Sequence, residues 1–235
     1  MAVNEPALSL VLLFYNEEEG IREIVSDLLK EFKRWTIQCE LVLVNNGSTD
    51  STAQILEELA EGFCTVRVVH VPVNLGYGWG ILCGFQAATS PIMGFMCGDG
   101  QVVPEDVERV YRRLVEEDLD ISKVVRVSRA DGWQRKMMSN IYNVLFRILF
   151  GVPSHDINGT PKFMRRHCYE KLNLTSKDWF IDAEIMVKAT KAHYRIGEVP
   201  VDFNPRTSGC SNVKWTTAFE FLRNMVRYRL DREER

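Results

Sequence analysis

Three polar clusters follow apolar runs of the chain, and their residue types suit a charged ligand. They are Tyr15 to Glu17, Asn45 to Asp50, and Gly98 to Gln101. In the last cluster, Asp99 and Gln101 alternate after an apolar run, so both side chains can face one ion. Carboxylate and amide oxygens are ligands for a hard divalent cation. An Asp-Gly turn that holds no ligand is the alternative interpretation.

The segments between these clusters predict alternating strands and helices. The continuous apolar run at 8–14 is typical of a strand buried on both faces, and 40–44 predicts a second buried strand. Residues 66–71 and 91–97 predict a third and a fourth strand. Helical periodicity separates the runs, which predicts a mostly parallel sheet flanked by helices. Ligands of such sheets bind outside the carboxyl ends of the strands. We therefore expect the three clusters to converge.

In order and spacing, these motifs resemble those of family 2 glycosyltransferases, in particular the polyprenyl-phosphate sugar synthases related to dolichyl-phosphate mannose synthase. The matching motifs are Tyr15-Asn16-Glu17, Asn46 to Asp50, Asn74 to Gly76 with Gly78, and Gly98 to Gln101 before Pro104-Glu105-Asp106. The resemblance covers nearly the whole chain and implies a GT-A fold. It also implies inverting transfer of a sugar from a nucleotide diphosphate sugar to a polyprenyl (dolichyl-type) phosphate.

The resemblance assigns a donor site to the first half of the chain. It implies Mg²⁺ or Mn²⁺ on Asp99 and Gln101, with Asp99 also counted as catalytic. The implied nucleotide-binding residues are Phe14, Tyr15, Asn16, Glu17, Asn45, Asn46, Gly76 and Gly98.

The chain departs from the family pattern at three of these positions. Cys97 stands where the metal segment usually begins with aspartate, and Asn45 and Asn46 stand where two aspartates usually end the second strand. A thiol is a poor ligand for Mg²⁺, and an asparagine offers donors as well as acceptors. The departures favour either an altered choice of base or weakened catalysis.

The second half of the chain resembles the acceptor side of the family. Arg129 follows a predicted strand at 123–128, and Arg135 and Ser139 lie four positions apart on one helical face. The resemblance implies that these three residues hold the acceptor phosphate, a role that suits the guanidinium fork. A solvated basic helix is the alternative.

Further family-like segments include Asp156 to Lys162, Trp179 to Glu184, and Arg206 to Ser211. The resemblance implies that Asp182 binds sugar hydroxyls, and it would act as a base only for a hydroxyl acceptor. It also implies that Arg206 lies on a glycine-hinged lid that closes on the diphosphate.

Residues 135–150 predict a helix that is apolar over most of its circumference. It is too short and too interrupted by Arg147 to span a bilayer, so we expect it, including Phe146 and Phe150, to lie at a membrane interface with the basic C-terminal helix from about 215. A core or oligomer contact is the alternative.

The whole-chain properties set the remaining expectations. A formal net charge of −3 argues against nucleic-acid binding, and no two of the six cysteines have metal-ligand spacing. We expect one domain, with a nucleotide-binding half (1–120) and an acceptor-binding half (121–235). We expect a cytoplasmic protein on the inner face of a membrane, as a homo-oligomer or with a separate anchoring subunit.

Two other functions stay open from the sequence. One is a glycosyltransferase that uses a hydroxyl (glycan) acceptor, and the other is a catalytically weakened nucleotide-sugar-binding protein. An unrelated nucleotide-binding protein is disfavoured, because the chain has neither Gly-x-Gly-x-x-Gly after its first strand nor a P-loop lysine.

Overall fold

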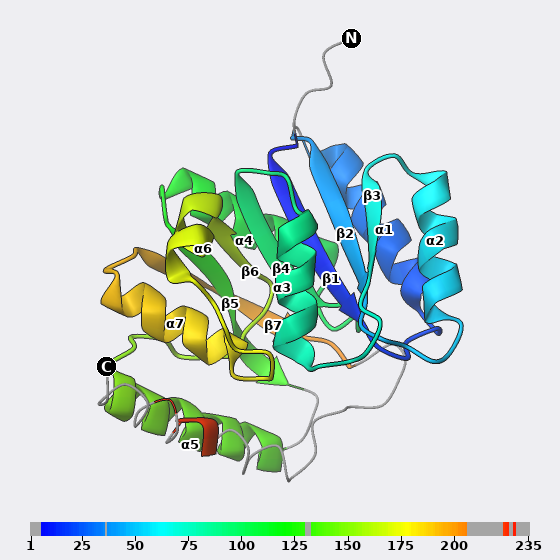
Figure 1. The fold of residues 1–235 in the computed structure, drawn as a ribbon. Helices are drawn as coiled ribbons and strands as arrows, with labels where there is room; N and C mark the ends of the chain where they lie inside the picture. Colours follow the sequence, from blue (N-terminus) through cyan, green and yellow to red (C-terminus); the bar gives the residue numbers. More distant parts are fainter. Residues whose placement is uncertain (1–5, 36, 130–132, 206–222, 226–227, 229–235) are drawn as a thin grey trace.

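The computed structural model describes residues 6–35, 37–129, 133–205, 223–225 and 228, and for residues 128–129, 133–136 and 138–140 it describes the backbone alone. A seven-stranded sheet forms the centre, in the order β3-β2-β1-β4-β6-β5-β7 (Figure 1). Its strands are β1 (Leu8–Phe14), β2 (Cys39–Asn45), β3 (Val66–His70), β4 (Ile92–Cys97), β5 (Ile121–Arg129), β6 (Lys162–Arg165) and β7 (Ile196–Phe203). All neighbours pair in parallel except β6, which runs antiparallel to β4 and β5.

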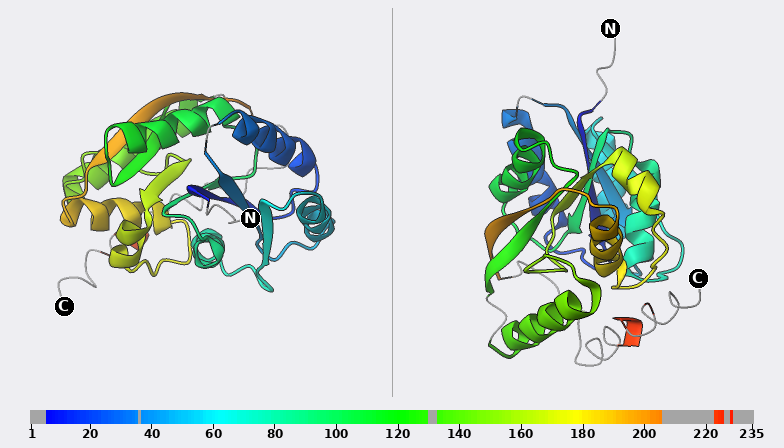
Figure 2. Two further views of the ribbon diagram at one scale, coloured as in Figure 1. Left: turned by 90° about the horizontal axis from the view of Figure 1, so that it is seen from above. Right: turned by 90° about the vertical axis from the view of Figure 1, so that its left-hand side faces the viewer.

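Helices cover both faces of this sheet, as views from two directions show (Figures 1 and 2). One apolar core joins the sheet to α1 (Ile21–Arg34), α2 (Thr52–Gly62) and α4 (Pro104–Glu116). A second core on the other face joins it to α3 (Tyr77–Ala87), α6 (Arg166–Leu172) and α7 (Ile181–Lys191). Alternate residues of β1 serve the two cores, with Leu10 and Leu12 in the first and Val11 in the second. Burial on both faces explains the unbroken apolar run that predicted this strand.

Helix α5 (Trp133–Phe150) does not lie on either face of the sheet. In Figure 1 it lies below the sheet, beyond the sheet end at which α7 begins. Phe146 is fully buried and contacts Phe180 and Phe150 in a third, smaller apolar cluster. The expectation that Phe146 lies at an interface is therefore wrong, because its ring is part of the core. Other apolar residues of α5 are exposed: Met137, Ile141, Val144, Leu145, Ile148 and Leu149.

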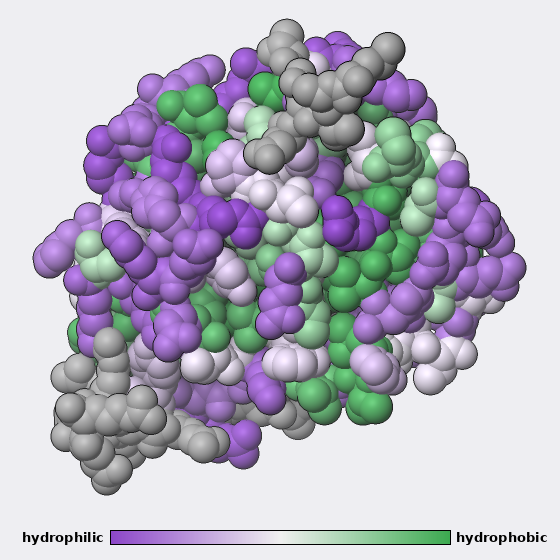
Figure 3. Space-filling model, turned by 45° about the horizontal axis from the view of Figure 1, so that its top comes forward, coloured by the Kyte–Doolittle hydropathy of each residue, from purple (hydrophilic) through white to green (hydrophobic). Residues whose placement is uncertain are grey.

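The end of the molecule opposite α5 comes forward in Figure 3. In that tilted view, hydrophilic residues occupy much of the margin, and hydrophobic residues gather toward the middle. Within the described part of the chain, none of the helices combines the length and the apolar character needed to cross a bilayer.

The predicted α/β class and the first four predicted strands are confirmed to within a residue or two. The predicted helix over 135–150 is confirmed as α5, with an earlier start at Trp133. The sequence did not indicate the antiparallel strand β6, which is only four residues long. The basic C-terminal helix lies largely outside the described residues.

Candidate functional site at the carboxyl edge of the sheet

The carboxyl ends of β1, β2 and β4 meet at one edge, as expected. The register pairs Phe14 with Asn45 and Leu13 with Cys97, so the segments that follow these strands start side by side. The loops after β1 and β2 are then joined by hydrogen bonds. Asn16 N donates to Ser48 Oγ at 3.0 Å, and Asn16 Oδ1 accepts from Thr49 N at 2.8 Å. These contacts hold two of the predicted nucleotide-binding segments in one position.

Asn45 is the last residue of β2, and both the oxygen and the nitrogen of its side-chain amide have hydrogen-bond partners. Its Oδ1 accepts from Ser48 N at 3.0 Å, and its Nδ2 lies 3.2 Å from Nδ1 of His70. The other ring nitrogen of His70 contacts Glu57. The sequence did not single out His70 or Glu57, although His70 ends β3, next to Asn45. Asn45 thus connects the loop after β2 to His70 on β3 and, through His70, to Glu57 on α2.

Asn46 is 2% exposed and faces the glycine loop. Its Nδ2 donates to Asn74 Oδ1 and to Gly76 O, each at 3.3 Å. Its Oδ1 is buried and has no hydrogen-bond partner among the residues that the structure describes. A buried acceptor without a partner is costly, so this oxygen is a candidate ligand contact.

The glycine loop positions α3 against the segment before α7. Gly76 has φ +122°, and a Cβ there would collide with the Lys177 carbonyl, so this position requires glycine. The rings of Tyr77 and Trp179 stack with their centroids 4.5 Å apart. The glycine loop after β3 and the Trp179 segment are thereby held next to each other.

Gly98 and Phe14 have a structural explanation. A Cβ on Gly98 would overlap the Phe14 ring, which is fully buried. The glycine therefore lets the backbone after β4 pass directly over that ring. The Phe14 side chain could contact a nucleotide only if the backbone at Gly98 moved away. In this structure Phe14 therefore supports the edge from below and is not exposed to a ligand.

Asp99 and Gln101 lie where the metal segment was predicted. Asp99 is 7% exposed, and its Oδ1 accepts from Gln101 N at 3.2 Å. Gln101 Nε2 donates to the carbonyl of Asn204 at 3.2 Å, and Asn204 N donates back to Gln101 O at 3.0 Å. Cys97 Sγ lies 4.0 Å from the Tyr77 hydroxyl. The two hydrogen bonds between Gln101 and Asn204 therefore hold the chain after β7 against the Asp99 segment.

The predicted lid and acceptor residues are only partly placed. Arg206 lies outside the described residues, but it follows two positions after Asn204. Arg129 ends β5, and Arg135 and Ser139 lie in α5 with their backbones alone described. The structure thus places the backbones of the three proposed acceptor residues on consecutive elements.

Asp182, at the start of α7, is buried in an ion pair that the sequence did not indicate. Lys162 Nζ lies 2.5 Å from Asp182 Oδ1 and 3.2 Å from the Ile157 carbonyl. Lys162 is fully buried, and its amine also lies 5.6 Å from the centre of the Phe95 ring. The pair links β6 to α7 and fixes the orientation of the Asp182 carboxylate.

A second network of buried charged side chains connects β5 with Asp156 and with Glu198 on β7. Arg126 binds Asp156 through two hydrogen bonds of 2.6 Å, and Lys123 contacts Ser154, the Asp156 carbonyl and Glu198. Burial lowers the pKa of the Lys123 amine to about 8, although the charges of Asp156 and Glu198 oppose that shift. The signal for this network was present in the sequence, as charged residues inside an apolar strand.

The Arg126 pairing predicts an acid-sensitive contribution to stability. Burial alone would raise the pKa of Asp156, but the Arg126 hydrogen bonds and charge, together with Lys123, lower it from 3.8 to about 2. The ionised form is thus favoured on folding, by about 2 kcal/mol. This contribution is present above pH 4 and is lost as the pH falls toward 2.

Asp156→Asn should therefore lower the free energy of unfolding at pH 7 by about 2 kcal/mol or more. Urea unfolding at pH 7 and at pH 3 measures the difference from wild type, which should shrink at pH 3. Asp27→Asn, which breaks an exposed pair with Lys30, is the matched control with little effect at either pH. A difference for Asp156→Asn that stays constant with pH would contradict the interpretation.

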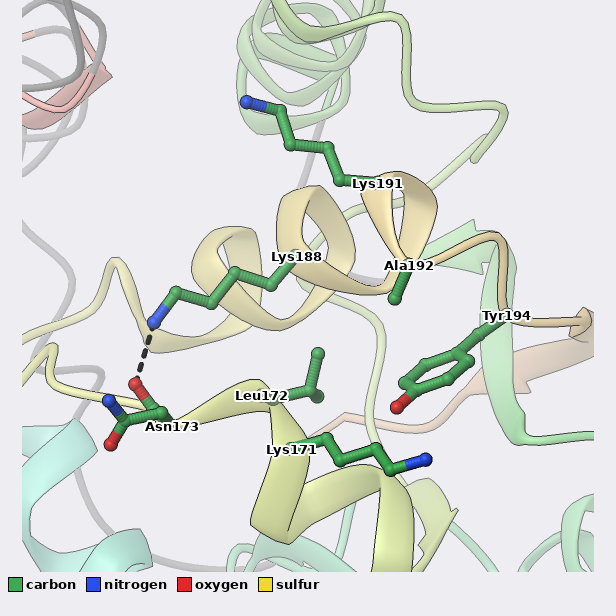
Figure 4. A pocket seen from close by; sticks show the side chains of 7 residues that line it. All are labelled: Lys171, Leu172, Asn173, Lys188, Lys191, Ala192 and Tyr194. Carbon is green, nitrogen blue, oxygen red and sulfur yellow. Dashed lines mark hydrogen bonds between the residues drawn. The ribbon is translucent and has the colours of Figure 1, made fainter. Parts of the chain in front are cut away.

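A separate hollow of about 530 Å³ lies between the ends of α6 and α7 (Figure 4). It is lined by Lys171, Leu172, Asn173, Lys188, Lys191, Ala192 and Tyr194. Its lysines lie in the last turns of the two helices, where cations are favourable, and Lys188 donates to the Asn173 carbonyl at 2.7 Å. It contains none of the predicted donor or acceptor residues.

Comparison with known proteins identifies the family of this chain. The model of the family described as "Glycosyl transferase family 2" matches residues 9–173. An undecaprenyl-phosphate 4-deoxy-4-formamido-L-arabinose transferase of Serratia proteamaculans is 31% identical over 74% of this chain and 54% of its own length. The corresponding protein of Proteus mirabilis is 30% identical over 70% of this chain and 51% of its own. The chain thus spans about half the length of these curated relatives.

Solved structures agree on the fold. Glucosyl-3-phosphoglycerate synthase of Mycobacterium tuberculosis, solved with phosphoglyceric acid, superposes with a TM-score of 0.72 over 97% of this chain and 80% of that protein, at 20% identity. Another structure of that synthase contains Mn²⁺, UDP and glucosyl-3-phosphoglycerate. S. aureus TarS with UDP-GlcNAc gives a TM-score of 0.63 at 17% identity, over 93% of this chain and 65% of that protein. The expected GT-A-like fold is confirmed. Because the family model matches residues 9–173, the chain belongs to glycosyl transferase family 2.

Proposed function

We propose that this domain transfers a sugar, with inversion, from a nucleoside diphosphate sugar to a polyprenyl phosphate. The observation that carries the proposal is the convergence of Asn45, Asn46 and Asp99 at the carboxyl edge, fastened to the β7 segment that leads to Arg206. The names of the two bacterial relatives support the lipid phosphate as acceptor class.

The residues at Asp99 fit a divalent cation. They offer one carboxylate and one amide oxygen, which are hard ligands, and Mg²⁺ is commonly held by one or two carboxylates together with substrate phosphates. The amide nitrogen of Gln101 is occupied by Asn204, so its oxygen is the atom left for an ion. A bound cation would neutralise the charge that develops on the diphosphate leaving group. Cys97 would take no part in holding it.

The protein's own contribution is then positioning. A phosphate monoester is ionised near neutral pH, so the acceptor needs no strong general base. Arg129, Arg135 and Ser139 would hold that phosphate, and Arg206 would exclude water over the diphosphate. Asp182, held by Lys162, would accept hydrogen bonds from sugar hydroxyls.

The test offers the protein a nucleoside diphosphate sugar that stabilises it in a thermal-shift screen, together with either a polyprenyl phosphate or a glycan. Preferential labelling of the lipid phosphate, with an inverted anomeric centre, is expected. Labelling of the glycan instead would overturn the acceptor class.

The replacement of three usual aspartates by Cys97, Asn45 and Asn46 favours a second candidate, a nucleotide-sugar-binding protein with weakened catalysis. Nucleotide binding without transfer to any acceptor would support this candidate.

We also propose that the exposed apolar row of α5 lies on an anionic membrane. Ile148 is 74% exposed and Ile141 is 52% exposed, although both are large aliphatic residues. Arg147 and the basic C-terminal residues would add electrostatic attraction. A polyprenyl phosphate would then meet the enzyme at the end of the molecule where α5 lies (Figure 1).

Ile141→Ser with Ile148→Ser should weaken binding to anionic vesicles by roughly tenfold or more, because a buried isoleucine contributes about 1.5–3 kcal/mol. Co-sedimentation measures it, and salt should change the binding of wild type and variant alike. Val73→Ser, at an exposed apolar residue away from α5, is the matched control. Equal sedimentation of the α5 variant and wild type would make the row a protein contact.

A further inference from the structure

A carboxylate, an imidazole and a thiol come together away from the carboxyl edge. Asp120 directly precedes β5, and His167 and Cys168 lie in the first turn of α6, which is at the opposite end of the sheet from α5 (Figure 1). Their ligand atoms all lie within 4.8 Å of one another. No two cysteines of the chain have the spacing of a metal site. Cysteine spacing does not indicate this group, because its members are of three different residue types.

The distances within the group suit a small tetrahedral ion. Cys168 Sγ lies 3.2 Å from His167 Nε2 and 3.6 Å from Asp120 Oδ1, and the last two atoms lie 3.9 Å apart. Zn²⁺ binds sulfur, nitrogen and oxygen at about 2.0–2.3 Å, which places tetrahedral neighbours roughly 3.3–3.6 Å apart. The observed distances of 3.2–3.9 Å bracket the tetrahedral range, so small movements of the three side chains would bring their ligand atoms around one ion.

The backbone holds Asp120 in place. Its Oδ2 accepts from Arg195 N at 2.8 Å, and its own N donates to the Arg195 carbonyl at 3.0 Å. Its carbonyl accepts from Arg165 N at 3.1 Å. Because Oδ2 is held by this hydrogen bond, Oδ1 is the oxygen directed at Cys168 and His167. In metal sites, such hydrogen bonds from outside the ligand set orient the ligands.

Access to the group is from one side. Cys168 is fully buried, whereas the His167 side chain is 56% exposed. An ion could therefore enter past the imidazole and keep a solvent molecule as its fourth ligand. A mixed set of thiolate, imidazole and carboxylate favours Zn²⁺ over the hard ions Mg²⁺ and Ca²⁺.

We propose that Asp120, His167 and Cys168 form a Zn²⁺ site with one open position. The bound ion links the residue before β5 to the first turn of α6, and so stabilises the junction between β6 and α6. This site is distinct from the Asp99 segment and does not depend on the transferase activity. The simpler reading, a hydrogen-bonded cluster in which the Cys168 thiol donates to Asp120, is the competing outcome.

Titration of the intact protein with Co²⁺ tests the site, because a thiolate bound to Co²⁺ absorbs in the near ultraviolet. The band should appear in wild type and be displaced by Zn²⁺, and it should vanish in Cys168→Ser. His167→Gln, at an exposed position that should not affect folding, should weaken Co²⁺ binding at least tenfold.

Cys97→Ser and Asp99→Asn are the matched controls and should keep the band, because both lie at the carboxyl edge. Loss of the band in Cys97→Ser together with its retention in Cys168→Ser would move the metal to that edge and overturn the proposal. Absence of the band in wild type would leave only the hydrogen-bonded cluster. If Cys168→Ser does not fold, His167→Gln decides alone: unchanged Co²⁺ affinity would also overturn the proposal.

Discussion

Replacing Lys162 with methionine is expected to lower the free energy of unfolding by about 3–5 kcal/mol. The substitution keeps most of the side-chain volume but leaves the Asp182 carboxylate buried without its cation. Removing one member of a buried pair costs more than the pair contributes, because the remaining charge has no water to solvate it. Denaturant unfolding at neutral pH measures the change.

A double variant separates this cause from a packing defect. Lys162→Met with Asp182→Leu removes both charges and should recover most of the lost stability. Lys171→Met, at an exposed lysine of α6, is the control for the loss of a positive charge alone. If the double variant is no more stable than Lys162→Met, the loss comes from the shape of the core rather than from an unpaired carboxylate.

The ion pair also bears on function. Because Lys162 holds Asp182 in one orientation, the double variant should fold and yet lose the sugar contact proposed for Asp182. The double variant should therefore regain stability but not turnover.

The parts of the fold that the sequence predicted are those with a local signal. The strand β1 is buried on both faces, so its residues had to be apolar without interruption. The polar clusters after β1, β2 and β4 could be placed together because parallel strands end at one edge. The sequence alone therefore predicts that Asn46 and Asp99 lie at the same edge of the sheet.

The parts that the sequence missed depend on pairings across the fold. Lys162 and Asp182 are twenty positions apart, and neither residue alone indicates that both are buried. The position of Lys123 inside an apolar strand was a signal of its buried charge network, but its partner Glu198 could not be identified, because the two residues meet only where β5 pairs with β7. The burial of Phe146 does not follow from the sequence, because α5 is apolar on more than one side and its composition does not show which side packs against the core.

Asp99→Ala is expected to reduce transfer by at least 10²–10³-fold, a loss comparable with removing one preorganised group that stabilises charge in a transition state. The carboxylate is the only acidic ligand among the proposed metal residues, since Cys97 stands where the family usually has an aspartate. Losing it should remove the cation from the diphosphate, so the effect should fall on turnover and on metal dependence together. Steady-state transfer assays across a range of Mn²⁺ and Mg²⁺ concentrations measure both.

Asp99→Asn and Cys97→Asp locate the origin of that loss. The asparagine can still accept the Gln101 hydrogen bond, so a fall as large as in the alanine variant assigns the effect to the charge and not to the loop. Cys97→Asp restores a carboxylate at the first position and should tighten the dependence on divalent ions if the site lacks only charge. Unchanged turnover in both Asp99 variants would remove the residue from the mechanism. Because Asn45 and Asn46 hold the nucleotide loops through neutral amides, catalysis by this edge would then depend on the arginines alone.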